Sequence, residues 1–212
     1  MSEWKTGRNM SEQGLRQRKK ARTHAGIVEA ATKAFLEFGY DNTTLEQVAE
    51  AAGVTKRTLL RYFPSKTHLV LGGQHEALEV FRSAAETREG RSILDIWEEH
   101  VAVNAQWIAE HGDAKVAQSI ATSEPAIIPE MLAIQAEYQA LIYAALLDEL
   151  GSSNLEDQAL CAVVAGALIG GNYQIGALFM ERGGYAELPA ATHKVIDLVR
   201  TRLLDGNAVD RG

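Results

Sequence analysis

The sequence predicts an all-α protein with two parts, a small basic N-terminal head of three helices and a larger acidic helical body. The 212 residues include only four prolines and few alternating β-branched runs, and apolar residues recur at helical spacing along most of the chain. Residues 1–66 carry twelve Lys and Arg against seven Asp and Glu, whereas residues 67–212 carry nine against twenty-one. The two parts therefore have net charges of +5 and −12, and we place the domain boundary between residues 64 and 65.

The first helix of the head is predicted over residues 21–39, ARTHAGIVEAATKAFLEFG. Its apolar residues lie at helical spacing, and Gly39 can adopt the left-handed conformation that ends a helix. These apolar residues are Ile27, Ala31, Ala34, Phe35 and Phe38. A polar basic arm that extends to about residue 20 precedes this helix.

Two short helices joined by a glycine turn are predicted to follow. Thr43 and, three residues later, Glu46 match a capping box, so the second helix is expected at about 44–52. Gly53 suits a left-handed turn, Thr55 can cap the third helix, and Pro64 ends it. This arrangement predicts a helix-turn-helix within the head, 1–64.

The third helix is predicted to have a basic face and a packed face. The basic stripe contains Lys56, Arg57, Leu60 and Arg61, and the other side contains Thr55, Leu59, Tyr62 and Phe63. A basic face on a helix-turn-helix indicates a nucleic-acid partner. The alternative is an ordinary helical hairpin whose charged residues are simply solvated.

The body, 65–212, is predicted to be helical throughout. Helices are expected near residues 65–87, 93–111, 113–122, 125–150, 154–182 and 189–204, separated by breaks rich in glycine, proline and serine. Residues 158–180 lack charged side chains, but they include Asn172, Gln174 and four glycines. We therefore expect a buried helix here rather than a membrane span.

The segment AFLEFGYDNTTLEQVAEAAGVTKRTLLRYFPSK, residues 34–66, resembles the DNA-binding signature of the TetR family of one-component transcriptional regulators. The resemblance covers about residues 27–66, and the body is similar to family members only in helix number and size. It implies that the third helix enters the major groove of DNA. The implied base-facing residues are Lys56, Arg57 and Arg61, and the implied phosphate contacts are Thr44, Tyr62 and Lys66.

The physical properties of these side chains agree with the implied roles. Arginine presents a planar fork that matches O6 and N7 of guanine, whereas lysine is a mobile point charge equally suited to phosphate. We therefore expect Arg57 and Arg61 to read bases, and Thr55 and Leu60 complete the predicted DNA-binding set. The arm with Arg16, Arg18, Lys19, Lys20 and Arg22 resembles N-terminal extensions that contact DNA, with a solubilising tail as the alternative.

Leu60 departs from the family pattern, which commonly has a phosphate-contacting tyrosine at this position. Leucine cannot make that hydrogen bond, although it can contact a thymine methyl group or a sugar. This departure supports the main rival function, a helical ligand-binding or scaffold protein without specific DNA recognition.

Polar residues on otherwise apolar helical faces predict a small-molecule site in the body. The predicted ligand-binding residues are Trp97, Val101, Asn104, Met131, Gln135, Tyr138 and Asn172. The alternative is a plain core whose amides are satisfied internally. Because the body carries −12, we expect a neutral, apolar or cationic effector.

The glycines of AGALIGGNYQIGALF cost helix stability, so the close approach of another helix is expected to compensate for them. Together with the last helix, they fit the two-helix dimer surface of the family. The predicted contacts are Gly166, Gly170, Ala177, Val195 and Val199. Tight packing within one subunit is the alternative.

The sequence shows no pattern for catalysis. It lacks a zinc motif, a glycine-rich phosphate loop and a nucleophile elbow, so we expect no enzyme activity, no metal and no cofactor. His75 and Glu79, four residues apart, are the best remaining pair for a metal. The single cysteine, Cys161, cannot form an intrachain disulfide, and the N-terminus has no apolar run for a signal peptide, so a cytoplasmic protein is expected.

These observations predict a ligand-responsive transcriptional regulator. It is expected to be a homodimer that binds a palindromic double-stranded operator and is released by a small-molecule effector. Repression rather than activation follows from the family resemblance alone. A helical enzyme is the remaining rival, and the missing catalytic pattern disfavours it.

Overall fold

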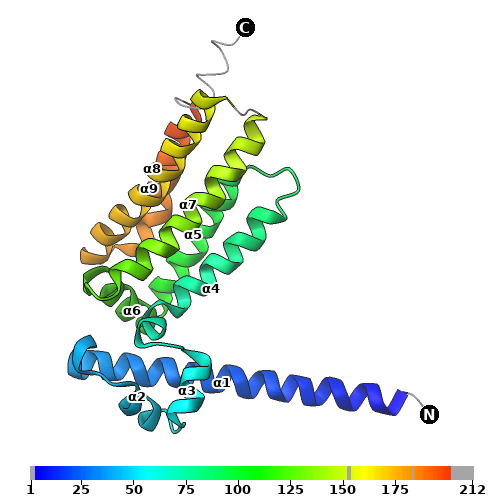
Figure 1. The fold of residues 1–212 in the computed structure, drawn as a ribbon, viewed down its shortest axis with the longest axis vertical. Coiled ribbons are helices and arrows are strands. Elements are labelled where there is room, and N and C mark those ends of the chain that lie inside the picture. Colours follow the sequence, from blue (N-terminus) through cyan, green and yellow to red (C-terminus); the bar gives the residue numbers. More distant parts are fainter. Residues whose placement is uncertain (1–2, 152–153, 183, 202–212) are drawn as a thin grey trace. The chain divides into compact units, whose positions relative to one another are not determined.

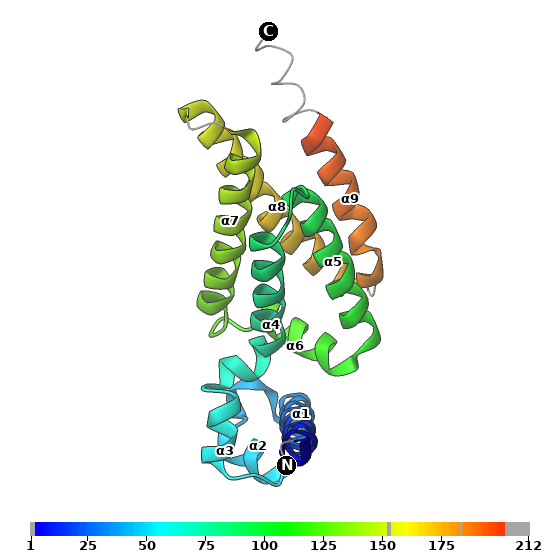
Figure 2. The same cartoon turned by 90° about the vertical axis from the view of Figure 1, so that its right-hand side faces the viewer.

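The computed structural model describes residues 3–151, 154–182 and 184–201, and every regular element in these ranges is helical (Figures 1 and 2). The helices are α1 Glu3–Asn42, α2 Leu45–Ala51, α3 Lys56–Tyr62, α4 Lys66–Glu86, α5 Ile93–Glu110, α6 Gly112–Ser123, α7 Ile128–Leu150, α8 Leu155–Glu181, the 3-10 helix η1 Tyr185–Glu187, and α9 Leu188–Val199. The predicted all-α class is confirmed. The chain divides into two compact units, Met1–Val70 and Leu71–Gly212.

The first unit is held together by a small apolar core. Ile27 of α1, Val48 of α2 and Leu59 of α3 are completely buried, and Phe63 directly after α3 is 3% exposed. The small side chain of Ala49 is also buried, which lets α2 and α3 approach closely. Of the apolar residues predicted to line one face of α1, Ile27, Ala31, Ala34 and Phe35 are buried, whereas Phe38 is 44% exposed.

Helix α1 is longer than the sequence predicts. It begins at Glu3, so the basic arm is helical, and its N-terminal half projects beyond α2 and α3 (Figure 1). Residues 3–20 contain no proline and many good helix formers, which explains the continuation. The predicted break at Gly39 is confirmed, since this residue has φ 78° and ψ 165° inside the helical segment.

The capping box of α2 is shifted by one residue from the predicted position. Thr43 is buried, and its hydroxyl donates to the carbonyl oxygens of Ala34 (3.1 Å) and Gly39 (2.8 Å). Thr44 caps α2 instead, accepting from the Gln47 amide at 3.2 Å, while Gln47 Oε1 accepts from the Thr44 amide at 2.8 Å. The prediction of Thr43 with Glu46 is therefore wrong, because Thr43 is used to close the end of α1.

The second unit is a bundle of long helices. Helix α7 packs along α8, and α9 packs against both α5 and α8. The fully buried core includes Phe81, Ile93, Ile142, Cys161 and Ile196 from five different helices. The predicted burial of Cys161 is confirmed, and burial raises the pKa of its thiol.

The predicted breaks between the body helices are close to those observed. Gly151 ends α7 in the left-handed conformation with φ 60°, and Asn154 caps α8 by accepting from the Asp157 amide at 2.8 Å. Helix α7 begins at Ile128 rather than at 125, because the chain first makes a turn in which the Ile127 amide donates to Glu124 O at 3.0 Å. The predicted end of the last helix, 202–204, lies outside the described residues.

Helix α8 is less buried than the sequence predicts. By length and composition it could cross a membrane, although a core helix of a water-soluble protein can have the same composition. Only 28% of its most apolar 18-residue window is buried, and Leu155 and Val163 are 81% and 64% exposed. The prediction that this helix is buried is therefore only partly correct for a single chain, because one part of the α8 surface is exposed.

Candidate functional site

The turn between α2 and α3 requires a glycine. Gly53 has φ 66°, and its amide donates to Glu50 O at 3.0 Å while the next amide, of Val54, donates to Ala49 O at 2.9 Å. The Thr55 hydroxyl then accepts from the Thr58 amide at 3.1 Å and caps α3, as predicted. These hydrogen bonds fix the direction in which α3 leaves the turn.

Helix α3 presents its basic residues to solvent. Lys56, Arg57 and Arg61 are exposed, and Leu60 between them is 36% exposed. Leu59 is completely buried and holds the opposite face against the head. The predicted separation into a basic face and a packed face is therefore present.

The three basic residues of α3 are in different electrostatic settings. Lys56 forms an ion pair with Glu46 of α2, and the hydrogen bond from Lys56 lowers the pKa of the Glu46 carboxyl group. Arg57 and Arg61 form no ion pair with any residue that the structure describes. Arg61 instead lies over the Tyr62 ring, with its guanidinium carbon 5.5 Å from the ring centroid. The two arginines are thus the basic residues of α3 available for an external partner.

Lys66 has a different environment from the other predicted DNA contacts. Its ammonium donates to the carbonyl oxygens of Tyr40 at 2.7 Å, Thr43 at 3.1 Å and Asp41 at 3.2 Å. It also lies 4.2 Å from the centroid of the Tyr40 ring. Lysine has three N–H donors, and all three are used to satisfy carbonyls where α1 ends. A phosphate contact would require Lys66 to give up at least one of these bonds.

Two further head residues lie at the ends of the recognition segment. Thr44 is exposed, but its hydroxyl is engaged with Gln47 as the cap of α2. Tyr62 is half-buried, and the ring of His24 from α1 lies 6.4 Å from it and 4.8 Å from Phe63. Sequence reasoning did not place His24 here, because no local pattern links residues so far apart in the chain.

In the body, the structure brings two predicted ligand-binding residues, Trp97 and Tyr138, together in an aromatic cluster, and a third, Asn104, lies beside it. The rings of Phe81, Trp97, His100 and Tyr138 all lie with their centroids 5.1–5.7 Å apart. Tyr138 and His100 share a hydrogen bond of 3.0 Å, and the Asn104 amide donates to His100 O at 2.8 Å. Phe81 and His100 were not among the predicted residues, although both occupy buried-face positions of their helices.

The aromatic cluster is uncharged and contains one unsatisfied donor. Burial lowers the pKa of His100 to about 4, so its imidazole is neutral at pH 7, and burial also raises the pKa of Tyr138. Trp97 is 4% exposed, and its Nε1–H has no hydrogen-bond partner among the described residues. An unsatisfied buried donor costs about 1–3 kcal/mol, which a bound acceptor would recover.

The other predicted ligand-binding residues differ in burial and in hydrogen bonding. Val101 and Met131 are buried, and Gln135 is half-buried. Asn172 is engaged elsewhere, because its Oδ1 accepts from the Thr192 hydroxyl of α9 at 2.9 Å. No pattern in the sequence links residues 172 and 192.

The predicted dimer residues differ in exposure. Gly170 is exposed and a side chain added there would meet nothing within 4 Å, whereas one at Gly166 would lie 3.5 Å from Gln139 Nε2. Ala177 and Val195 are half-buried. Val199 is 5% exposed, so it offers little surface to another molecule.

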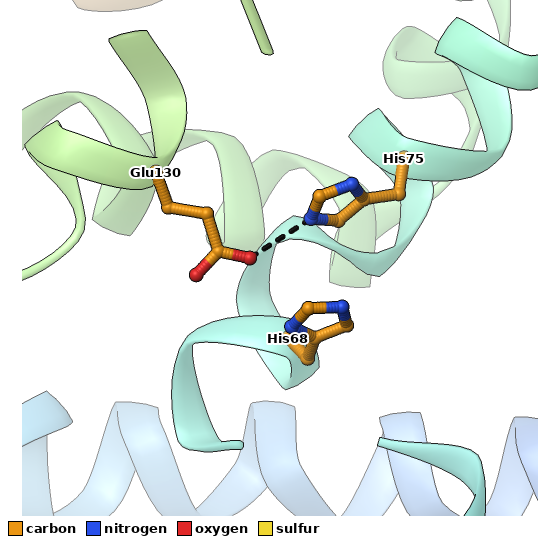
Figure 3. A group of neighbouring side chains, drawn as sticks. All are labelled: His68, His75 and Glu130. Carbon is orange, nitrogen blue, oxygen red and sulfur yellow. Dashed lines mark hydrogen bonds and ion pairs between the residues drawn. The ribbon is translucent and has the colours of Figure 1, made fainter. Parts of the chain in front are cut away.

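The pair considered for a metal, His75 and Glu79, is not formed. His75 Nε2 lies 2.9 Å from Glu130 Oε1 of α7 (Figure 3), and Glu79 instead pairs with Arg82 at 3.5 Å. The partner of His75 comes from a distant segment, which spacing along one helix cannot reveal.

Residues 27–72 match the family model of bacterial regulatory proteins of the tetR family. The HTH-type transcriptional regulator TcmR of Streptomyces glaucescens is 44% identical over 75 residues, which cover 35% of this chain and 33% of TcmR. The chain thus matches about a third of that relative's length.

Solved structures share the fold over a longer range. The fatty acid degradation regulator FadR from Bacillus halodurans aligns with a TM-score of 0.60 and 17% identity, covering 84% of this chain and 98% of FadR. FadR from Bacillus subtilis in complex with stearoyl-CoA aligns with a TM-score of 0.56 and 17% identity, covering 84% and 97%. Such identities show the fold alone. The match of residues 27–72 and the identity with TcmR confirm the predicted resemblance: the N-terminal part of the chain is a helix-turn-helix of the TetR family of transcriptional regulators.

Proposed function

We propose that this protein is a ligand-responsive repressor that binds a palindromic DNA operator as a homodimer and is released by a small-molecule effector. The observation that carries the proposal is the exposed pair Arg57 and Arg61 on α3, unpaired with any described acidic residue. Each guanidinium can donate two hydrogen bonds to O6 and N7 of a guanine in the major groove. The head, 1–64, would bind DNA, and the body, 65–212, would bind effector and partner, in the cytoplasm.

The proposal of a homodimer is supported by the exposed apolar face of α8 and α9. Val163 is 64% exposed, Leu178 is 42% exposed and Leu198 of α9 is 60% exposed. The open space at Gly170 means that nothing within the described chain compensates for this glycine in a helix. A second copy that packs there would bury this face and provide a second recognition helix. Two such helices would read half-sites about 34–36 Å apart.

We propose that the effector binds at or beside the aromatic cluster of Phe81, Trp97, His100 and Tyr138. The cluster is apolar and uncharged, and Trp97 Nε1–H is a donor available to an oxygen or nitrogen of the effector. Bacillus subtilis FadR was solved with stearoyl-CoA, which shows a bound acyl compound in a protein of this fold. For this chain, the −12 charge of the body favours a neutral, apolar or cationic effector.

Leu60 favours a second candidate function, a ligand-binding or scaffold protein without specific DNA recognition. It is exposed in the middle of the basic stripe and cannot donate a hydrogen bond to phosphate. A head of this kind would bind DNA weakly, with an affinity that depends on salt but not on sequence.

Selection of bound sequences from random DNA separates the two functions. We expect a palindrome to be enriched, and Arg61→Ala to weaken binding to it by about 1–3 kcal/mol while reducing discrimination at one base position. Lys56→Ala is the matched control on the same face, and we expect a smaller loss because Lys56 is already paired with Glu46. Failure to enrich any sequence would favour the second function.

A further inference from the structure

We infer that His68, His75 and Glu130 form a binding site for a divalent transition-metal ion of the zinc class. The site goes beyond the proposed function, which names no metal, and its test does not depend on DNA binding. It departs from the sequence-based expectation of no metal, because the three residues come from two separate helices and form no motif along the chain.

The three side chains lie close together (Figure 3). Each offers one ligand atom, a ring nitrogen of His68 and of His75 and a carboxylate oxygen of Glu130, and these atoms all lie within 4.8 Å of one another. His75 Nε2 and Glu130 Oε1 are already 2.9 Å apart. Tetrahedral coordination with bonds of about 2.0–2.1 Å places ligand atoms about 3.3 Å apart. Small side-chain rotations therefore convert this group into a coordination site.

Two of the three ligands are carried by one helix. His68 and His75 are seven residues apart, about two helical turns, in α4. Because α4 is continuous over Lys66–Glu86, the helix itself places both imidazoles on one face. Leu71 and Leu78 lie on the same face and are 0% and 2% exposed. These buried leucines anchor the face of α4 that carries the two histidines.

The third ligand, Glu130, is positioned by the first turn of α7. The amide of Met131 donates to Ile127 O at 3.0 Å, and both residues are buried, Ile127 completely and Met131 at 5% exposure. The backbone that carries Glu130 is therefore fixed on both sides of this residue. A ligand that is already held in place does not have to be ordered when the ion binds, which favours affinity.

The ligand atoms select a class of metal ion. Two imidazole nitrogens and one carboxylate oxygen suit Zn²⁺ and neighbouring first-row ions, whereas Mg²⁺ and Ca²⁺ prefer oxygen ligands. Three protein ligands leave a fourth position for water or for a donor atom of a small molecule. The side chains of His75 and Glu130 are 34% and 29% exposed, so an ion can enter from solvent. The −12 charge of the body also attracts cations.

The rival interpretation is a hydrogen bond between His75 and Glu130 that only links α4 to α7. The body contains a second pair of this kind, in which His193 Nδ1 of α9 lies 2.6 Å from Glu98 Oε1 of α5. Within the described residues this second pair does not belong to a group of three possible ligands. It therefore supplies a matched control, a histidine paired with a carboxylate but without a coordination site.

The test measures Zn²⁺ binding to the full-length protein, without a histidine tag and after metal removal by a chelator. Competition with a chelating dye gives the affinity and the number of ions bound. We expect His68→Gln, His75→Gln and Glu130→Gln each to weaken binding at least about 100-fold, since even the loss of an outer-shell partner costs about 10–100-fold. His193→Gln should bind Zn²⁺ like the unmodified protein, and Mg²⁺ in excess should not displace Zn²⁺.

A second measurement is thermal unfolding, because an ion that binds only the folded protein raises the midpoint Tm. At a free Zn²⁺ concentration about a hundredfold above Kd, we expect Tm to rise by about 5–10 °C in the unmodified protein and in His193→Gln. Glu130→Gln keeps the size of its side chain and should show no rise. The inference is overturned if Zn²⁺ leaves the Tm of the unmodified protein unchanged, or if His193→Gln weakens Zn²⁺ binding as much as His75→Gln does. Unchanged Zn²⁺ affinity in Glu130→Gln or His68→Gln would also overturn it.

Discussion

Lys66 shows that the role implied by a sequence motif can differ from the contacts that a side chain makes in the folded protein. Its spacing in the signature implies a phosphate contact, yet its three donors satisfy carbonyls of residues 40, 41 and 43. Carbonyl groups at the end of a helix need partners, and a lysine at the start of α4 satisfies those at the end of α1. The residue therefore supports the head, whether or not it also reaches DNA.

We expect Lys66→Met to destabilise the head in the absence of DNA by about 1–2 kcal/mol, because three carbonyl oxygens are left without their charged donor. Unfolding in urea, monitored by circular dichroism, measures the change. Lys33→Met is the control, since the Lys33 ammonium is exposed and pairs only with Glu29 on the same helix. Equal stabilities of the two variants would show that the Lys66 hydrogen bonds contribute nothing.

His100 gives the body a pH-dependent stability. Its pKa is about 4 in the folded protein and about 6.5 when unfolded, so the unfolded chain takes up a proton first as the pH falls. Above pH 6.5 the neutral imidazole makes its full contribution to the free energy of unfolding. As the pH falls from 6.5 to 4, the free energy of unfolding decreases by up to about 3 kcal/mol. We expect His100→Gln to flatten the unfolding free energy over this range. An unchanged pH profile in this variant would contradict the buried neutral imidazole.

At the scale of elements, two glycines with similarly open surroundings have different backbone conformations. Gly53 lies in the turn between α2 and α3, and Gly26 lies within α1. A side chain added at Gly53 or at Gly26 would meet no atom within 4 Å, so sterics with neighbours do not distinguish them. Gly53 has φ 66°, whereas Gly26 lies inside a regular helix. Only the backbone conformation therefore decides the effect of substitution.

We expect Gly53→Ala to destabilise the head by about 1 kcal/mol, because alanine resists the left-handed conformation. Gly26→Ala is expected to stabilise it by about 0.4–1 kcal/mol, because alanine is the better helix former. Urea unfolding of the two variants measures both changes. Shifts of the same sign would show that the positive φ at Gly53 is not required.

At the scale of the whole molecule, the exposed face of α8 predicts the oligomeric state. We expect the unmodified protein to be a dimer by light scattering at micromolar concentration and Gly170→Leu to shift it towards monomer, with little change in helix content. Gly26→Leu is the control, because this glycine also has open space around it in a helix but lies in the head. A monomeric unmodified protein would contradict the proposed assembly.

The sequence by itself determined the all-α class, the helix-turn-helix and the basic face of α3. These features depend on local rules: helical spacing of apolar residues, a glycine at the turn, a threonine cap and a proline stop all act within a few residues. The one-residue error at the cap of α2 arose because Thr43 and Thr44 are adjacent candidates, and only the hydrogen bonds of Thr43 with α1 distinguish them.

The tertiary structure alone decided which distant side chains meet. It joins Lys66 to the end of α1, His75 to Glu130, and Phe81 to the ring of Tyr138, and it leaves Gly170 without a neighbour. These outcomes depend on which helix faces pack together, and many pairings of amphipathic helices bury similar apolar area. Spacing along the chain identifies the face that is buried, but only packing determines its partner.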